Sequence, residues 1–379
     1  MPYWRLSGFY FFYFATLGAI VPYFSVYLRS VGFNAAQIGE LMAIIMLSRI
    51  VAPYIWGWIA DHQNQRMIVV RLAALLSAVM FAGVFFSSKF WWLALVMLAF
   101  SFFWNATLPQ VEAATMSHLG GRASQYARVR LWGSIGFIIT VVGLGSLFDF
   151  VDPWWLLPIV MILLGLIWVS SLLVPDRDMS VETEHHGPLL KVLFRPDVFA
   201  FLFACFLMQA SHGPYYTFYT IYLSDFGYST TLIGWLWALG VVCEIGVFIL
   251  LHRIQRRLSL RWIMLGSCAL AAVRWLLIGY FPQRLELLLL AQVLHAVTFG
   301  AYHAAAIEMV HNFFRGKHQT RGQAIYGSVS FGLGGALGSI YAGYIWDTGG
   351  AAMTFTIAAM LAAAATVVAW RWVHSSATY

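Results

Sequence analysis

The sequence predicts an all-α membrane protein of twelve transmembrane helices, arranged as two pseudo-symmetric six-helix bundles. Three observations support this class: the composition, the length of the apolar runs, and a passage that recurs half a chain later. Hydrophobic residues make up 61% of the chain and charged residues only 10%. About 25% of the residues in a soluble domain are charged. A soluble globular protein is therefore excluded.

The apolar runs are each long enough to cross a bilayer, which takes about 20 helical residues. The first run is long and aromatic and lacks the small-residue cleavage pattern of a signal peptide, so we expect it to remain as a span. Cys205, Cys243 and Cys268 all lie in runs and show neither a disulfide framework nor a CxxC metal pattern. The twelve runs cover residues 6–28, 37–60, 67–86, 90–116, 129–148, 154–174, 198–223, 230–251, 260–280, 285–311, 322–345 and 351–372.

The passage that recurs lies at the turn between the first two spans of each half. Residues 27–41 return as residues 222–236, with a Tyr-Leu pair and two glycines in the same places and an offset of 195 residues. Residues 132–137 match residues 326–331 at nearly the same offset, and Val111-Glu112 matches Ile307-Glu308. A parallel repeat of membrane helices is typical of one large class of transporters, which bind substrate where the halves meet.

The repeat also predicts the domain organisation. The longest polar stretch, residues 175–197, separates six spans from six. We expect an N-terminal bundle at 1–174, a cytoplasmic linker at 175–197, and a C-terminal bundle at 198–379. The linker contains His185-His186, which we interpret as a solvated pair rather than a metal site. We expect no metal, no cofactor and no obligatory protein partner.

The basic residues are distributed very unevenly between the two sides of the predicted bundle. Loops on the side of both termini hold seventeen of the 22 Lys and Arg residues, and the opposite side holds only Arg29, Lys89 and Arg284. The positive-inside rule therefore predicts that both termini lie in the cytoplasm. Because topology explains the net charge of +7, we expect no nucleic-acid partner. The short loops leave no room for a soluble catalytic domain, so we expect no enzyme.

Ionisable residues inside spans are costly, and they mark candidate functional sites. Glu112 in the fourth span is the first candidate. Asn105 lies two helical turns earlier on the same face, and Pro109 between them interrupts the backbone ladder. Arg130 begins the next span. Glu112 and Arg130 either hold a polar substrate between them or form a static ion pair.

A second set of candidates lies in the C-terminal half. His295, Phe299 and Tyr302 share a face of the tenth span, and His303 follows beside them. An intramembrane histidine relays protons near neutral pH, or it is hydrogen-bonded within the bundle. Glu244 and Arg274, on consecutive spans, are also candidates for proton coupling or for a structural pair.

Two kinds of residue in the seventh and eleventh spans have a structural and a functional interpretation. Tyr216 and Tyr219 follow a break at Gly213-Pro214. They belong to the interfacial aromatic belt, or they line a cavity that stacks on a ring. Gly334 and Gly338 form a GxxxG pattern in the eleventh span, which indicates close helix packing rather than a hinge.

The loop after the second span carries a family resemblance. Gly57-Trp58-Ile59-Ala60-Asp61, followed by Arg66, resembles the GxxxD-plus-basic signature of the major facilitator superfamily. The resemblance implies the fold of that superfamily. It also implies that Gly57, Asp61 and Arg66 act in the conformational change.

The candidate residues themselves resemble the oligosaccharide:proton symporter branch, typified by lactose permease. Glu112 and Arg130 stand 18 residues apart, like the substrate-binding acid and arginine of that branch, and Arg274 and His295 resemble its coupling residues. The chain departs from the pattern where Thr298 replaces an acid, Gln292 replaces a basic residue and Phe137 replaces a sugar-stacking tryptophan. The departures weaken the expectation of a sugar substrate.

Over its whole length the chain resembles the 3-phenylpropionate permeases of enteric bacteria. The resemblance implies proton-coupled uptake of a small aromatic carboxylate across the inner membrane of a bacterium. The alternatives are a sugar or nucleoside symporter and an exporter on the same scaffold. A phenyl ring would suit Phe137, Tyr216 and Tyr219, and a carboxylate would suit Arg130, Arg274 or Arg49. Proton coupling would fall to Glu244, Arg274, His295 and His303.

Overall fold

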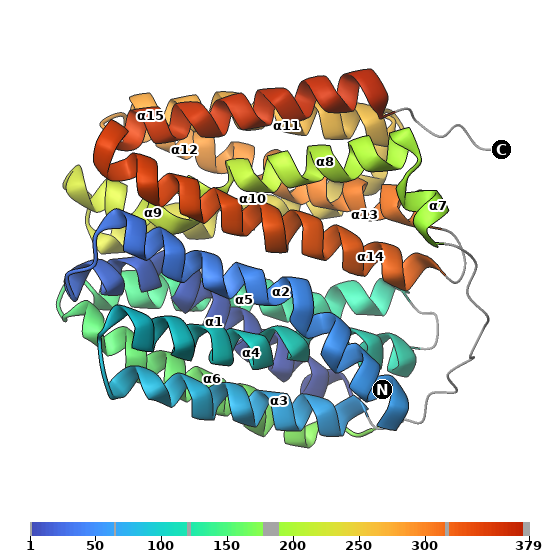
Figure 1. Ribbon diagram of the computed structural model, residues 1–379, viewed down its shortest axis with the longest axis horizontal. Helices are drawn as coiled ribbons and strands as arrows, with labels where there is room; N and C mark the ends of the chain where they lie inside the picture. The colour runs from blue at the N-terminus through green and yellow to red at the C-terminus, as the bar shows by residue number, and fades with distance from the viewer. Residues whose placement is uncertain (1, 64–65, 120–122, 177–188, 315–317, 374–379) are drawn as a thin grey trace. The chain divides into compact units, whose positions relative to one another are not determined.

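The computed structural model describes residues 2–63, 66–119, 123–176, 189–314 and 318–373 (Figure 1). Every regular element within these residues is a helix, which confirms the predicted all-α class. The chain divides into two compact units. Unit 1 comprises Met1–Glu182 with Tyr228–Trp235, and unit 2 comprises Thr183–Gly227 with Leu236–Tyr379.

Unit 1 is built from six long helices, two of which begin or end in a short 3₁₀ turn. Helix α1 packs against α5 and α6, while α4 packs against α2 and α3. The helices are α1 (Tyr3–Ser30), α2 (Ala35–Gln63), α3 (Arg66–Phe81), α4 (Phe90–Leu119), α5 (Ala123–Leu147) and α6 (Leu156–Leu173), with η1 (Ala82–Phe85) and η2 (Pro153–Trp155).

Unit 2 has more, shorter helices because several spans are interrupted. The predicted break at Gly213-Pro214 is confirmed, since α8 ends at Ser211 and α9 begins at Gly213. The tenth and eleventh spans each contain a π-helical segment, η3 and η5. The helices are α7 (Leu189–Leu193), α8 (Pro196–Ser211), α9 (Gly213–Asp225), α10 (Thr230–Gln255), α11 (Leu260–Tyr280), α12 (Leu285–His295), η3 (Ala296–Ala301), α13 (Tyr302–Phe313), α14 (Gln319–Gly327), η5 (Ser328–Gly334) and α15 (Gly335–Trp372).

Eleven helical stretches of the described chain are long and apolar enough to cross a membrane. The last, Arg321–Trp372, has 52 residues, whereas one crossing takes about 20. Gly350 interrupts it with a φ of 75°, a left-handed backbone conformation that glycine adopts readily. Figure 1 shows the chain reversing direction within α15, so this stretch accounts for two of the twelve predicted spans.

The sequence repeat reappears in the helix boundaries and in the turns. Ser30 and Asp225 end the first helix of each copy, and Ala35 and Thr230 begin the next. Gly32 and Gly227, at the same offset of 195 residues, have φ values of 95° and 82°. Residues with a Cβ rarely adopt these values. The repeated glycine therefore marks the same tight turn in both copies.

Close packing at Gly334 and Gly338 is confirmed. A Cβ at Gly338 would lie 2.6 Å from the Ala210 carbonyl oxygen, and a Cβ at Gly334 would lie 2.6 Å from the Phe206 carbonyl oxygen. Gly213 belongs to the same helix contact, because a Cβ at position 213 would lie 2.1 Å from the Gly338 carbonyl carbon. The absence of side chains thus lets η5 and α15 approach the α8–α9 junction backbone to backbone.

The first turn of α10 belongs to unit 1, where Asp149 caps it from the loop after α5. One carboxylate oxygen of Asp149 accepts hydrogen bonds from the Thr230 amide and hydroxyl, at 2.7 and 2.6 Å. The other accepts from the Thr231 amide and hydroxyl, at 3.2 and 2.5 Å. The α5 and α10 backbones are close here, since a Cβ at Gly145 would lie 2.6 Å from the Thr230 carbonyl oxygen.

Replacing Asp149 with alanine is expected to lower the free energy of unfolding by about 1 kcal/mol, because an anionic cap at a helix N-terminus is lost. The same hydrogen bonds set the pH dependence of this stabilisation. Partial burial of Asp149 would raise its pKa, but the hydrogen bonds from Thr230 and Thr231 have the larger combined effect and lower the pKa. The stabilisation is therefore present above the ordinary pKa of about 3.9 and lost as pH falls through the lower folded-state pKa. Thermal unfolding should show a constant difference between about pH 5 and 8 that shrinks only below about pH 4. A difference that vanished near neutral pH would contradict this account.

Candidate functional site

Glu112 lies on α4 in unit 1, where it is half-buried. Its nearest polar contact comes from Tyr126 at the start of α5, whose hydroxyl donates to the carboxylate at 3.3 Å. No ion pair joins Glu112 to Arg130 among the residues that the structure describes. Glu112 and Arg130, the predicted partners, both belong to unit 1, but the polar contact to Glu112 comes from Tyr126.

Arg130 on α5 is also half-buried, and aromatic rings of α1 surround its guanidinium. The guanidinium carbon lies 3.8 Å from the ring centroid of Phe14 and 5.9 Å from that of Tyr10. Tyr10 in turn donates to Thr115 on α4 at 3.3 Å. Helices α1, α4 and α5 thus converge on one group of polar and aromatic side chains, which includes both Glu112 and Arg130.

Asn105 is buried, and its side chain forms hydrogen bonds with residues of α2 rather than with Glu112. Its amide donates to the Ser48 hydroxyl at 2.7 Å and to the Ile45 carbonyl at 3.2 Å. Its carbonyl oxygen accepts from Nε of Arg49 at 3.2 Å. Asn105 and Glu112 therefore both lie on α4, as predicted, but the hydrogen bonds of Asn105 go to α2 and not to Glu112.

The other predicted residues of unit 1 lie at two places. Phe137 is 8% exposed, and its backbone packs on Gly18 of α1, where a Cβ would lie 2.9 Å from the Phe137 carbonyl oxygen. Arg66 begins α3, and its guanidinium donates to the Gln110 side chain at 3.5 Å. Gly57 also faces Gln110. The side chain of Asp61 lies outside the described part of the chain, so the role of this loop stays a prediction.

In unit 2, Glu244 of α10 lies against His295 of α12, with carboxylate oxygen and Nε2 3.8 Å apart. Their side chains are only 18% and 7% exposed. Two glycines allow this approach: a Cβ at Gly300 would lie 2.8 Å from Cγ of Glu244, and one at Gly240 would lie 3.1 Å from Cδ2 of His295. The predicted acid and histidine are thus brought together.

Arg274 of α11 is fully buried. Its Nε donates to the Ala291 carbonyl at 2.8 Å, and Nη1 contacts the Thr298 hydroxyl at 3.5 Å. Its guanidinium carbon lies 4.3 Å from the Tyr215 ring centroid and 4.6 Å from that of Trp275. The contacts of Arg274 therefore run to a carbonyl, a hydroxyl and two rings.

Gln292 links the tyrosines of α9 to α12. It accepts from Tyr215 at 2.9 Å and donates to Tyr219 at 2.6 Å. Tyr219 is fully buried, and its ring packs edge-on against Trp237 at 5.6 Å. Tyr216 is half-buried and stacks between Trp237 and His212. Tyr216 is therefore the more accessible of the two predicted tyrosines.

The π-helical segment η3 changes which residues of the tenth span line up. His295, Phe299 and His303 stack, with centroid distances of 5.2 and 6.1 Å and interplanar angles of 6° and 11°. A π turn contains more residues than an α turn, so the position that continues the face of His295 two turns later moves from residue 302 to residue 303. Tyr302, expected on this face, is fully buried. His303 also contacts the Tyr326 hydroxyl at 3.1 Å.

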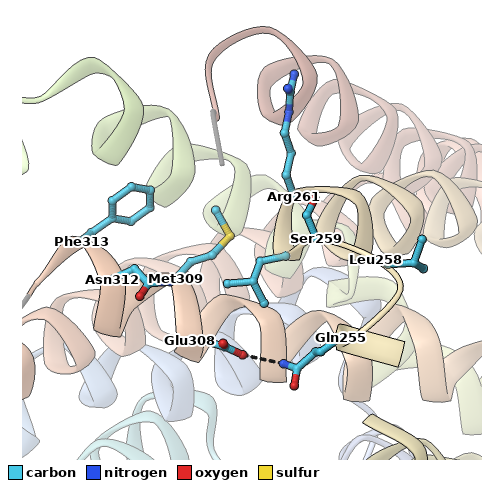
Figure 2. A pocket seen from close by; sticks show the side chains of 9 residues that line it. Gln255, Leu258, Ser259, Arg261, Glu308, Met309, Asn312 and Phe313 are labelled. Carbon is cyan, nitrogen blue, oxygen red and sulfur yellow. Dashed lines mark hydrogen bonds between the residues drawn. The ribbon is translucent and has the colours of Figure 1, made fainter. Parts of the chain in front are cut away.

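A pocket of about 230 Å³ lies at the end of unit 2 where α10, α11 and α13 meet (Figure 2). Glu308 and Gln255 face each other there, and the amide donates to the carboxylate at 2.5 Å. Glu308 is the counterpart of Glu112 in the repeat, yet it is exposed. The pocket contains none of the predicted site residues. Among the described residues no cluster suits a metal, and His185-His186 lie outside them.

The sequence did not predict several of the contacts in these clusters. Tyr126 follows Glu112 by fourteen residues across a turn, and nothing in that spacing indicates a hydrogen bond. Phe14 and Tyr10 belong to the aromatic run of the first span, which signals an aromatic face but no partner. Gln292 stands one helical turn before His295, a spacing that does place both on one face.

Comparison with known proteins agrees with this architecture. The profile of the MFS_1 like family matches residues 3–357. The chain is 29% identical to the "Probable 3-phenylpropionic acid transporter" of Escherichia coli K12, with 91% of each chain covered. It is 23% identical to the maltose permease of Geobacillus stearothermophilus, over 92% of this chain and 90% of that one.

The fold is also that of solved transporters. Crystal structures of the nucleoside transporter NupG superpose with TM-scores of 0.84 for a mutant and 0.81 for the unmutated protein, at 17% identity and over 98% of this chain. The mutant is covered over 99% of its length and the unmutated protein over 98%. Because the family profile spans most of the sequence, the chain belongs to the MFS_1 like family and is a multi-pass secondary transporter of the major facilitator superfamily, not an enzyme.

Proposed function

We propose that this protein is a proton symporter that takes up a small aromatic carboxylate, such as 3-phenylpropionate, across a bacterial inner membrane. The observation that carries the proposal is Arg130, a half-buried cation stacked on Phe14. The E. coli relative named for 3-phenylpropionic acid supports the choice of substrate.

The contacts of the three intramembrane arginines distinguish their roles. Arg274 is fully buried and already donates to a backbone carbonyl. Arg49 donates to Asn105. The guanidinium of Arg130 makes no hydrogen bond or ion pair with the described part of the chain. Its planar donors therefore suit bidentate binding of a substrate carboxylate, with Phe137 of the same unit as a candidate contact for the ring.

Glu244 and His295 are the residues that couple proton movement to transport in this proposal. A carboxylate and an imidazole in a low-dielectric site exchange a proton readily, and intramembrane acids and histidines commonly form such relays. The pair lies near the buried Arg274, so a proton taken up by Glu244 leaves an uncompensated positive charge in the cluster.

The direction of transport depends on whether proton and substrate move together or in opposite senses. The positive-inside distribution predicts that both termini lie in the cytoplasm, and in a symporter an inward proton gradient drives uptake. In vesicles, labelled 3-phenylpropionate is expected to enter and to be displaced by unlabelled aromatic acids but not by maltose or uridine. Displacement by uridine or maltose alone would favour the nucleoside or sugar alternative. Efflux driven by the same gradient would favour an exporter.

A further inference from the structure

The contact between Arg130 and Phe14 depends on a residue with no side chain. A Cβ at Gly133, one turn after Arg130 on α5, would lie 2.7 Å from Cδ2 of Phe14 and 2.8 Å from Nη1 of Arg130. Real Cβ atoms essentially never approach so closely. The stacked pair therefore occupies the volume that any side chain at position 133 would fill.

The next glycine along the same face explains why the ring reaches the guanidinium. A Cβ at Gly136 would lie 2.2 Å from the Phe11 carbonyl oxygen, so the α5 and α1 backbones are in direct contact. Phe14 lies one turn after Phe11 on α1. Gly136 thus fixes the separation of the two helices, and Gly133 clears the space into which Phe14 and Arg130 fit.

We propose that Phe14 and Gly133 are positioning residues, which hold the guanidinium of Arg130 in the orientation that binds the substrate carboxylate. The guanidinium carbon lies 3.8 Å from the Phe14 ring centroid, a cation–π contact that holds the group by its face. Its N–H groups make no hydrogen bond with the described residues and remain available for a bidentate pair. Phe14 lowers the conformational freedom that a flexible arginine would otherwise lose on binding. This inference rests on the proposed function, because it assumes an anionic substrate at Arg130.

The test compares Phe14→Leu and Gly133→Ala with Gly143→Ala in the full-length protein in proteoliposomes. Gly143 lies on the same helix and has nothing within 4 Å of its Cβ position. For labelled 3-phenylpropionate, both positioning variants are expected to raise KM about five- to tenfold with little change in maximal rate. Gly143→Ala should keep the wild-type KM. Phe14→Tyr, which retains a ring, should fall between wild type and Phe14→Leu.

A second readout separates positioning from a general loss of stability. Competition by the neutral amide 3-phenylpropionamide should be unchanged in Phe14→Leu, while competition by the acid weakens, because only the acid uses the guanidinium fork. An unchanged KM and an unchanged acid-to-amide ratio in Phe14→Leu would overturn the inference and leave the proposed function standing. No uptake of the acid by the wild-type protein would overturn both.

Discussion

Replacing Glu244 with glutamine is expected to abolish accumulation of substrate against its gradient while leaving exchange of internal for external substrate intact. Glutamine keeps the shape of the side chain beside His295 but carries no titratable proton. Exchange requires only that the loaded carrier reorients, whereas net uphill transport requires that the proton leaves. The measurement is labelled-substrate accumulation and counterflow in the same proteoliposomes.

Glu308→Gln is the matched control for this prediction. Glu308 is a second glutamate in the described helices of unit 2, but it is exposed and bonded to Gln255. It is expected to accumulate substrate as the wild type does. Uphill accumulation by Glu244→Gln would remove Glu244 from the coupling role and direct attention to His295 and His303.

Replacing Arg130 with alanine is expected to lower uptake at sub-saturating substrate by about thirtyfold or more, since losing one partner of a buried charge pair costs about 2 kcal/mol or more. Glu112→Gln is likewise expected to abolish uptake, because the acid lies in the same group of side chains. Both proteins should insert and remain monodisperse in detergent.

Arg128→Ala supplies the comparison for Arg130→Ala. Arg128 lies two residues earlier on α5 and is exposed, so its loss should leave uptake close to wild type. Equal losses in the two variants would indicate a general effect of positive charge on α5 rather than a carboxylate receptor. Normal uptake by Arg130→Ala and Glu112→Gln together would refute the site assignment in unit 1.

The features that could be predicted from the sequence are those that depend on local chemistry and on the repeat. Gly32 and Gly227 were visible as repeated turn glycines, and both adopt positive φ. Gly334 and Gly338 indicated close packing, which the α8 contact confirms. In each case one residue type meets one backbone requirement, so no knowledge of distant partners is needed.

The features that could not be predicted depend on how helices pack or depart from ideal geometry. The contact of Tyr126 with Glu112 is set by the α4–α5 approach, which sequence spacing does not encode. The η3 segment widens a turn, so His303 rather than Tyr302 continues the stack from His295. The reason for a glycine at position 133 depends on Phe14 and Arg130, which fill its side-chain volume, and sequence spacing does not indicate that contact.

The central claim is that an inward proton gradient drives uptake of an aromatic carboxylate. The most direct test uses the purified full-length chain in proteoliposomes, with labelled 3-phenylpropionate outside and a proton gradient imposed or omitted. Accumulation above the external concentration is expected only with the gradient, and a protonophore should collapse it. Accumulation that ignored the gradient, or no uptake above empty liposomes, would contradict the account.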